Sequence, residues 1–429
     1  MESFIPVFVA FGLMFIAIPI PVCLLAGTFV YFTFINTGLP LTGVIQNLIT
    51  QNMSVSLLAP LFFVTAGTIM SYSGIADKMF DFCDCLLGHK KGGLAYVNVA
   101  LSTMNGGMQG SAVADVAYQC KVLVPQMAKK GYPVPFSAAV TAATALITPI
   151  IPPGTGLILY ALVANQSVGR MWAAGYVPGF MLAGAMLVVC YIYANKNNWK
   201  GEREHRASGK EILRTAAGSA LALIIPLFLI FGLRSGLFTA VEGGTVMVML
   251  AIIIGICYRN LKPNLILPIL KESFDCVANV MLITVSACGF STYLTWERIP
   301  HKMAQAMLEF TSNPTIFMLL VLVLVLFLGM FVDSTALLMV LTPIFYPIAE
   351  AYGIDLIAFG IILIISVNIG AITPPFGGLM FLSCKFTGCD IPEFTKYALP
   401  FILCMICVVL LIIFFPGIAT FMPNLIYGA

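Results

Sequence analysis

Two stretches of this sequence share one pattern: Ile150-Ile151-Pro152-Pro153-Gly154-Thr155-Gly156-Leu157 and Ile372-Thr373-Pro374-Pro375-Phe376-Gly377-Gly378-Leu379. In each stretch, paired prolines followed by glycines interrupt a long apolar segment. The first proline of the pair follows a glycine, Gly131 or Gly353, at the same distance of 21 residues in both cases. Each proline removes a backbone N–H and leaves a carbonyl one turn earlier without its helical partner. The pattern therefore predicts two broken helices, over about 134–165 and 355–387.

A second pair of matching segments lies upstream of these breaks. Residues 115–125 and 333–343 both begin with Asp and end with Pro after nine intervening residues. Because two independent spacings recur in the same order, we interpret the chain as two related halves, residues 1–211 and 212–429.

The composition places both halves in a membrane. Hydrophobic residues make up 60% of the 429 residues and charged residues only 9%, against roughly 25% charged in soluble domains. Apolar runs of about 20 residues recur, each long enough to cross ~30 Å of hydrocarbon as a helix. We therefore predict an all-α polytopic membrane protein that is partnered by the lipid bilayer and by no nucleic acid. The twelve cysteines, with only three histidines, are interpreted as buried thiols rather than a metal site or a disulfide framework.

Charge placement predicts that the two halves lie in opposite senses. Lysines flank the segment 93–128 on both sides, whereas no Lys or Arg lies near either end of the segment 315–349. By the positive-inside rule, the first segment starts and ends in the cytoplasm and the second starts and ends outside. A segment with both ends on one side is a re-entrant helical hairpin. Arg298, His301 and Lys302 fall on the predicted outer side, and an interfacial helix with snorkelling side chains would accommodate them.

The predicted fold is thus two inverted-topology repeats. Each has about five membrane helices, one of them broken, plus one re-entrant hairpin. Such repeats place binding sites near the midplane of the bilayer, where helix ends offer N–H groups to anions and carbonyls to cations. Hydroxyl, carbonyl and carboxylate oxygens, which hard cations prefer, are concentrated at the two hairpin tips and the two breaks.

This reasoning gives a set of candidate site residues. The first sodium site would use the tip at Ser111 and carbonyls around the first break. The second would use Asp333 with its following hydroxyls and the second break, and an organic anion would sit between the two sites. The candidate sodium ligands are Gly110, Ser111, Ile151, Pro152, Gly154, Asp333, Ser334, Thr335, Thr373, Pro374 and Gly377. The candidate substrate contacts are Asn105, Gly106, Gln109, Thr155 and Gly378.

Purely structural roles compete with these assignments. Proline and glycine also serve simply to kink and pack transmembrane helices, although four paired breaks favour a functional interpretation. A carboxylate inside a membrane segment is a functional candidate by default. For Asp115, a functional role is set against a structural one, as a helix cap or a structurally paired carboxylate. Both the functional and the structural interpretation stay open. For Asp333, which Ser334 and Thr335 follow, ion coordination is favoured.

Enzymatic function is not predicted. The sequence contains no G-x-x-x-x-G-K-[ST] loop, no H-E-x-x-H helix and no G-x-S-x-G elbow. Ser111 has no histidine near it in sequence, which makes a membrane hydrolase a weak rival to a transporter. No cofactor is expected apart from sodium as the coupling ion. A passive channel and a stand-alone divalent-anion/sodium symporter are the remaining rival functions.

At these motifs the sequence resembles the large membrane subunit of TRAP (tripartite ATP-independent periplasmic) transporters. The resemblance covers both halves in order. In the first half it rests on Gly110–Asp115, Pro125–Met127, Gly131-Tyr132, Ile151–Gly154 and Ala174–Gly179. In the second half it rests on Phe331–Asp333, Pro343, Gly353–Asp355, Phe359-Gly360 and Thr373–Gly377.

The resemblance implies a sodium-coupled importer of organic acids in the bacterial inner membrane, working by an elevator motion. The family's substrates include C4-dicarboxylates, sialic acid, other sugar acids and sulfonates. It also implies two partners: a small four-helix membrane subunit and a periplasmic substrate-binding protein. One departure concerns the first tip, where the family usually has a Ser-Gly-Ser-Ser-like run and this chain has Met108-Gln109-Gly110-Ser111-Ala112. Gln109 would either replace a hydroxyl ligand or adjust the fit of the substrate.

Overall fold

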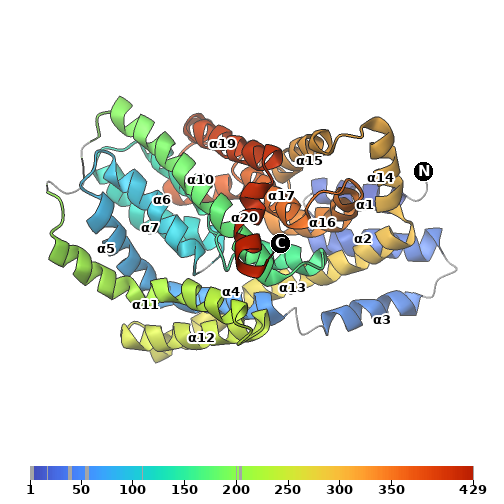
Figure 1. Cartoon of the computed structure of the whole chain (residues 1–429), viewed down its shortest axis with the longest axis horizontal. Helices are drawn as coiled ribbons and strands as arrows, with labels where there is room; N and C mark the ends of the chain where they lie inside the picture. The colour runs from blue at the N-terminus through green and yellow to red at the C-terminus, as the bar shows by residue number, and fades with distance from the viewer. Residues whose placement is uncertain are drawn as a thin grey trace.

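The computed structural model shows a protein built of helices throughout the part of the chain that it describes (Figure 1). That part comprises residues 4–16, 18–36, 41–53, 58–108, 110–199, 201 and 205–428. Within it, five helices are long and apolar enough to cross a membrane, or up to seven if each bent pair of helices counts as one span. The prediction of an all-α polytopic membrane protein is confirmed.

The helices follow the predicted order, and the predicted boundary between the halves, at residues 211 and 212, falls within the first turn of α11, which begins at Gly209. The first half contains α1 (Ile5–Phe15), α2 (Ile20–Val30), the π-helix η2 (Tyr31–Ile35), α3 (Leu41–Asn52), α4 (Leu58–Tyr72), α5 (Ile75–Leu87), α6 (Gly93–Gly106), α7 (Ala112–Lys129), α8 (Val134–Ala145), α9 (Thr155–Val163) and α10 (Val168–Lys196). The second contains α11 (Gly209–Arg234), α12 (Ala240–Cys257), the 3₁₀ turn η4 (Pro263–Leu265), α13 (Ile266–Trp296), α14 (Ile299–Phe310), α15 (Pro314–Gly329), α16 (Ser334–Ala351), α17 (Leu356–Gly370), α18 (Gly378–Thr387), α19 (Ile391–Phe414) and α20 (Gly417–Tyr427).

Each predicted hairpin and broken helix is a pair of helices separated by a short break. The segment 93–128 is α6 followed by α7, and 315–349 is α15 followed by α16. The broken helices are α8 with α9 and α17 with α18. Both breaks contain a cis peptide bond between their two prolines. The re-entrant course of the hairpins and the inversion of the halves remain predictions.

One long helix, α13, ties the early helices α2 and α4 to the second half of the chain. Near one end of α13, the Tyr72 hydroxyl of α4 donates a hydrogen bond of 2.6 Å to the Glu272 carboxylate. Near the other end, the Tyr31 hydroxyl donates to Glu297 at 2.7 Å. These polar contacts fix α13 at both ends, and the helix also packs on α2 and α4.

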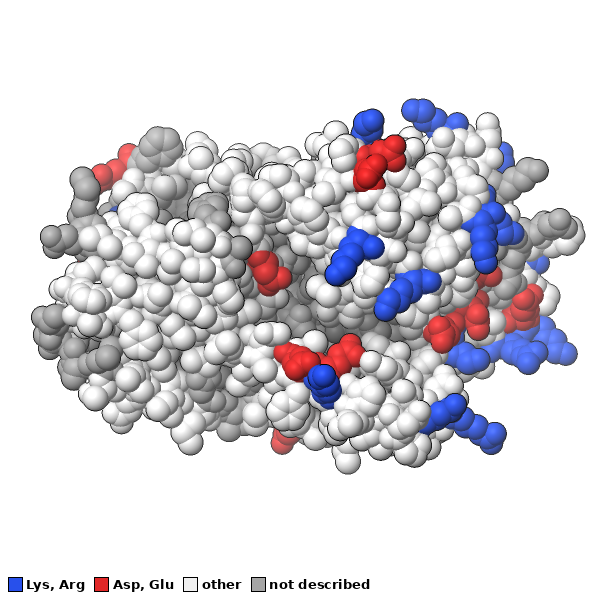
Figure 2. All heavy atoms as spheres, turned by 180° about the vertical axis from the view of Figure 1, so that it is seen from behind, with Lys and Arg blue, Asp and Glu red and all other residues white. Residues whose placement is uncertain are grey.

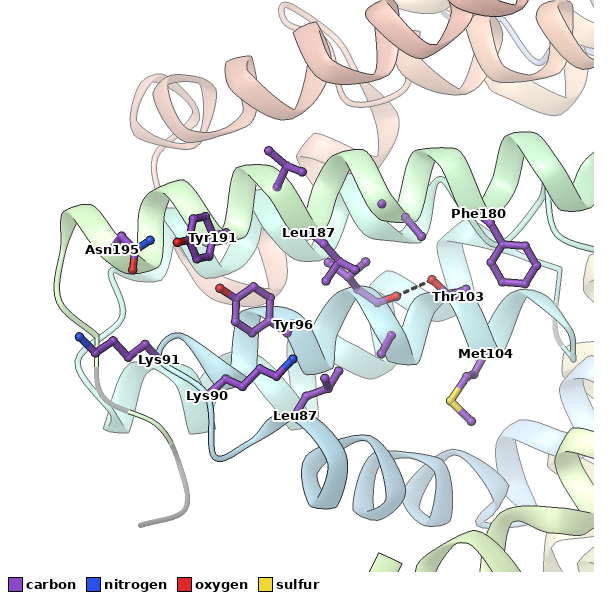
Figure 3. A pocket seen from close by; sticks show the side chains of 15 residues that line it. Leu87, Lys90, Lys91, Tyr96, Thr103, Met104, Phe180, Leu187, Tyr191 and Asn195 are labelled. Atoms are coloured by element: carbon purple, nitrogen blue, oxygen red, sulfur yellow. Dashed lines mark hydrogen bonds between the residues drawn. The ribbon is translucent and has the colours of Figure 1, made fainter. Parts of the chain in front are cut away.

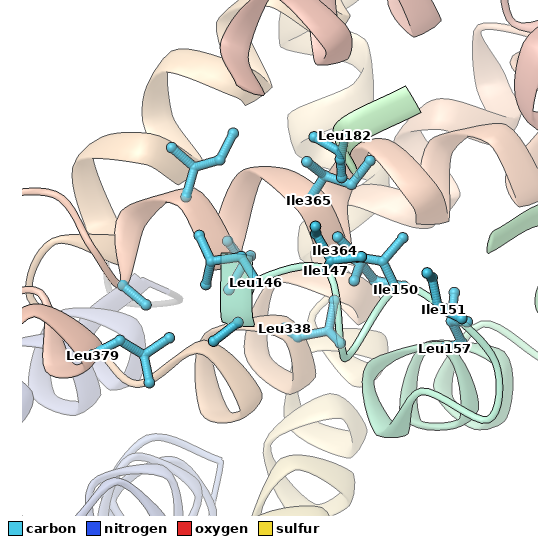
Figure 4. Packing of buried hydrophobic residues seen from close by; sticks show 14 of the residues in the cluster. Leu146, Ile147, Ile150, Ile151, Leu157, Leu182, Leu338, Ile364, Ile365 and Leu379 are labelled. Atoms are coloured by element: carbon cyan, nitrogen blue, oxygen red, sulfur yellow. The ribbon is translucent and has the colours of Figure 1, made fainter. Parts of the chain in front are cut away.

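The two halves interlock around the breaks. The Tyr160 hydroxyl of α9 donates to the carbonyl of Leu356, the first residue of α17, at 2.7 Å. In the reverse sense, the Ser383 hydroxyl of α18 donates to the Ala138 carbonyl of α8 at 3.0 Å. Each broken helix therefore contacts its counterpart. Figure 4 shows the buried aliphatic cluster around these contacts, labelled at Leu146, Ile147, Ile150, Ile151, Leu157, Leu182, Leu338, Ile364, Ile365 and Leu379.

Lys and Arg side chains gather at one end of the molecule (Figure 2). Figure 2 views the molecule from behind, so this end corresponds to that of α5, α6 and α11 in Figure 1. The predicted outer basic residues lie elsewhere, at the start of α14, which is a short amphipathic helix. There Lys302 forms an ion pair of 3.2 Å with Glu297, so an acidic neighbour compensates part of the positive charge.

Candidate functional site

A cavity of about 400 Å³ lies where the two hairpin tips and the two broken helices meet. Its walls come from segments far apart in sequence, because the interlocking of the halves brings the four breaks together. The lining residues are Gly110, Ser111, Ala112, Val113, Pro149, Thr155, Phe331, Val332, Asp333, Ser334, Thr335, Asn368, Ala371, Phe376, Gly378, Leu379 and Leu382.

Four helix N-termini face this cavity. Ser111 is the N-cap of α7 and Thr155 is the first residue of α9. In the second half, Asp333 is the N-cap of α16 and Gly378 is the first residue of α18. All four residues line the cavity. Since a helix N-terminus carries unpaired N–H groups and the equivalent of about half a positive charge, the site is suited to anions.

The first tip is held against the first break by backbone contacts. Gly110 has φ +59°, a left-handed conformation, and a Cβ atom there would lie 3.0 Å from the Pro153 carbonyl oxygen. The Thr155 hydroxyl donates a hydrogen bond of 3.1 Å to the Gly110 carbonyl. Glycine is therefore required for this close approach, and Thr155 connects the tip of the hairpin to the start of α9.

The second tip meets the second break in a similar way. Gly329 at the end of α15 lies against Gly370 at the end of α17, backbone to backbone. The Thr373 hydroxyl donates to the Ile369 carbonyl at 2.7 Å, so this predicted sodium ligand is bonded within its own segment.

Asp333 combines a capping role with exposure to the cavity. Its Oδ1 atom accepts hydrogen bonds from the backbone N–H groups of Thr335 at 3.0 Å and Ala336 at 3.3 Å. The residue is nevertheless exposed and lines the cavity next to Ser334. A capping carboxylate with this exposure is placed to contact a cation as well.

Asp115, its sequence counterpart, has a different environment. It is fully buried and accepts hydrogen bonds from Ser102 at 2.6 Å, Asn105 at 2.7 Å and Gln119 at 2.8 Å. The Ser102 hydroxyl also lies 3.1 Å from the Thr144 hydroxyl of α8. These bonds join both arms of the first hairpin to the broken helix. Asp115 is thus a structurally paired carboxylate away from the cavity, one of the two interpretations left open by the sequence.

The structure brings about half of the predicted site residues to the cavity. Those that line it are Gly110, Ser111, Thr155, Asp333, Ser334, Thr335 and Gly378. Others lie in the breaks without lining it, namely Ile151, Pro152, Gly154, Thr373, Pro374 and Gly377. Asn105 and Gly106 are buried elsewhere: Asn105 binds Asp115, and Gly106 packs on Thr148 and Ile151. Gln109 lies outside the described residues.

Sequence reasoning missed several residues of the wall. Asn368 is 7% exposed and lies near the end of α17, two residues before Gly370. A lone amide in a largely apolar helix was a usable signal, since polar groups inside a membrane are expensive. The rings of Phe331 and Phe376 lie 5.6 Å apart, centre to centre, at the rim, and composition alone does not distinguish them from lipid-facing aromatic residues.

The charge around the cavity is unusual for an anion site. None of its lining residues is Lys, Arg or His, and the one charged residue in the wall is the acidic Asp333. Nowhere among the described residues do three or more His, Cys, Asp or Glu side chains group so as to hold a metal ion. Anion binding here would therefore depend on helix ends and hydroxyls, with a cation needed to offset Asp333.

Comparison with known proteins indicates a single transporter family. Residues 7–418 match the family described as "Tripartite ATP-independent periplasmic transporter, DctM component". The chain is 31% identical to the "Sialic acid TRAP transporter large permease protein SiaM" of Vibrio cholerae, covering 97% of each chain. It is also 31% identical to the "C4-dicarboxylate TRAP transporter large permease protein DctM" of Pseudomonas aeruginosa, covering 86% of each. The crystal structure of the YdaH transporter of Alcanivorax borkumensis has a similar fold, with a TM-score of 0.63, 14% identity and 89% of each chain covered.

Proposed function

Because this chain belongs to the DctM-component family of tripartite ATP-independent periplasmic transporters, we propose that it is the large transport subunit of a sodium-coupled importer of small organic acid anions. The substrate class is a carboxylate- or sulfonate-bearing acid, such as a C4-dicarboxylate, sialic acid or another sugar acid. Two relatives are named for sialic acid and C4-dicarboxylate transport.

The convergence of four helix N-termini on one cavity is the observation that supports anion transport. Ser111, Thr155, Asp333 and Gly378 mark those termini at the wall. Backbone N–H groups can bind a carboxylate without a Lys or Arg side chain, and they hold it weakly enough for release. A transporter needs this balance, because substrate must leave the site as readily as it enters.

The acidic residue in the same wall supports the proposal of sodium coupling. An anion entering the cavity would be repelled by the Asp333 carboxylate unless a cation were bound beside it. The candidate ligands around that cation are the Asp333 carboxylate, the hydroxyls of Ser334 and Thr335, and carbonyls of the second break. The second cation would lie at Ser111, near the Gly110 tip and the first break. Binding of sodium would then raise the affinity for the anion, which is the thermodynamic requirement of symport.

The protein would act with two partners in the inner membrane of a bacterium. A periplasmic binding protein would deliver the anion, and a small four-helix membrane subunit would complete the membrane complex. The helices around the cavity would move as a unit against a scaffold of helices such as α2, α4, α12 and α13. This elevator motion would expose the cavity alternately to the two sides of the membrane.

Transport by proteoliposomes that contain this chain and both partners is the direct test. Uptake of radiolabelled sialic acid and of a C4-dicarboxylate would be compared under an inward sodium gradient and under equimolar potassium. We expect accumulation only with the sodium gradient and the binding protein. Equal uptake without sodium would refute the coupling. Full uptake by this chain alone would instead indicate a stand-alone divalent-anion/sodium symporter.

A further inference from the structure

A second and larger cavity lies apart from the transport site, as a groove between α6 and α10. Its volume is about 810 Å³. The groove is lined by Leu87, Lys90, Lys91, Tyr96, Val99, Ala100, Thr103, Met104, Phe180, Ala183, Gly184, Leu187, Val188, Tyr191 and Asn195. None of these residues lines the transport cavity, so the groove calls for its own explanation.

The groove is polar at one end and apolar along the rest of its length. Figure 3 shows Lys90 and Lys91 near Tyr191 and Asn195 at one end, with Met104 and Phe180 toward the other. Lys90 and Lys91 are both exposed, and no ion pair joins either of them to another described residue. The basic end belongs to the same end of the molecule at which Lys and Arg gather in Figure 2.

The dimensions of the groove match one leaflet of a bilayer. From Gly93, where α6 begins, to Met104, the helix rises roughly 16 Å at 1.5 Å per residue. Half of a ~30 Å hydrocarbon core is about 15 Å. On α10 the lining runs from Phe180 to Asn195, the half of that helix next to the basic end. A partner's transmembrane helix would need contacts along the full thickness, which this groove does not offer.

Small residues make the groove deep enough to hold an acyl chain. A Cβ atom built on Gly184 would have no neighbour within 4 Å, and Ala100 and Ala183 line the groove beside it. By contrast, Phe180 and Val188 are each 58% exposed and border the same space with apolar surface. Exposed apolar walls around a hollow are stable in a bilayer only when hydrocarbon fills them.

We propose that the groove between α6 and α10 binds a phospholipid with an anionic headgroup. The phosphate and headgroup would lie at Lys90 and Lys91, and an acyl chain would run along Thr103, Gly184 and Phe180. Basic pockets between helices on the cytoplasmic side of a membrane are suited to anionic lipid headgroups. Long lysine side chains reach the headgroup level while their stems cover apolar surface.

The test measures lipid binding by the purified full-length chain in detergent. Native mass spectrometry would follow titration with phosphatidylglycerol and with phosphatidylcholine of identical acyl chains. We expect the first phosphatidylglycerol molecule to bind more tightly than the first phosphatidylcholine molecule. The double variant K90Q/K91Q should weaken it by roughly 10- to 30-fold and leave phosphatidylcholine nearly unchanged. The matched control is K129Q/K130Q, which removes the same charge at the end of α7, outside the groove, and should keep the preference.

A second variant tests the apolar part of the site separately from charge. Gly184→Leu places a side chain in open space on the helix, so it should fill the groove without disturbing the fold and should weaken binding of both lipids. Gly12→Leu, on a glycine of α1 that also has no neighbour within 4 Å, is the control. Equal affinity for the two lipids in the unaltered chain would overturn the proposal. So would an equal loss in K129Q/K130Q, or groove variants that leave lipid binding intact.

Discussion

Gly329 and Gly370 touch through their backbones: a Cβ atom on Gly370 would lie 2.5 Å from the Cα atom of Gly329. Gly329 ends α15 and Gly370 ends α17, so this contact joins the second hairpin tip to the second break. No other residue type permits such an approach without moving one of the two helices. The contact therefore sets the separation of the α16 and α18 N-termini that face the transport cavity.

We expect Gly370→Ala to destabilise this junction, because the added methyl group must displace the backbone of Gly329. Overpacking of this kind costs about 1–3 kcal/mol, which should lower the melting temperature of the purified protein and reduce transport. The control is Gly417→Ala at the start of α20, where the new Cβ atom meets nothing within 4 Å. A Gly370→Ala protein as stable and active as the Gly417→Ala protein would contradict this account.

The sequence was sufficient to locate the breaks but not all of their neighbours. Paired prolines withhold N–H groups wherever they stand in a membrane helix, so Pro152 and Pro374 marked interrupted helices without any tertiary information. Glycine and hydroxyl residues at the tips marked the other two breaks. Local chemistry determined these features, and local chemistry can be predicted.

The remaining parts of the site depend on packing that local patterns do not encode. Asp115 and Asp333 occupy equivalent sequence positions, yet Asp115 is enclosed by Ser102, Asn105 and Gln119 whereas Asp333 faces the cavity. The difference arises from how α6 packs against α7 and α8. For the same reason Asn105, predicted to contact substrate, binds Asp115 instead.

Asp333→Asn should weaken sodium activation of transport with little loss of stability. Asparagine is as good an N-cap as aspartate, so α16 keeps its cap while the charge is removed. Loss of a charged contact of this kind corresponds to roughly a tenfold or larger increase in the sodium concentration for half-maximal uptake. The measurement is uptake as a function of sodium in proteoliposomes, with melting temperature as the control. An unchanged sodium dependence would remove Asp333 from the cation site.

Asp115→Ala should lower stability and leave the sodium dependence of transport unchanged, the reverse of what we expect for Asp333→Asn. It leaves three buried donors without their acceptor, and each such group costs about 1–3 kcal/mol. We expect a marked drop in melting temperature and in the yield of folded protein. For the fraction that folds, the sodium dependence should stay close to that of the unaltered chain. A stable Asp115→Ala protein with altered sodium dependence would show instead that this carboxylate takes part in ion binding.

Thr155 offers a test of the bond between the first tip and the first break. Thr155→Val keeps the shape of the side chain and removes the donor to the Gly110 carbonyl, whereas Thr155→Ser keeps the donor. The bond is worth about 0.5–1.5 kcal/mol, so uptake at low substrate concentration should fall by up to about tenfold in the valine variant. The Thr155→Ser variant should retain most of the uptake that the valine variant loses. Equal activity of the two variants would mean that the hydroxyl has no role.

The re-entrant course of the hairpins can be tested by the labelling of single cysteines from each side of the membrane. Lys91→Cys and Lys130→Cys flank the first hairpin, and Ser312→Cys and Glu350→Cys flank the second; all four positions are exposed. The background would carry serine at the exposed cysteines Cys257, Cys276 and Cys407. Because positive loops stay in the cytoplasm, an impermeant maleimide added to intact spheroplasts should label positions 312 and 350 only. Positions 91 and 130 should react only after the membrane is opened. If either pair gave one reactive and one protected cysteine, that hairpin would cross the membrane. The convergence of four helix N-termini on one cavity would then need an explanation other than two inverted halves.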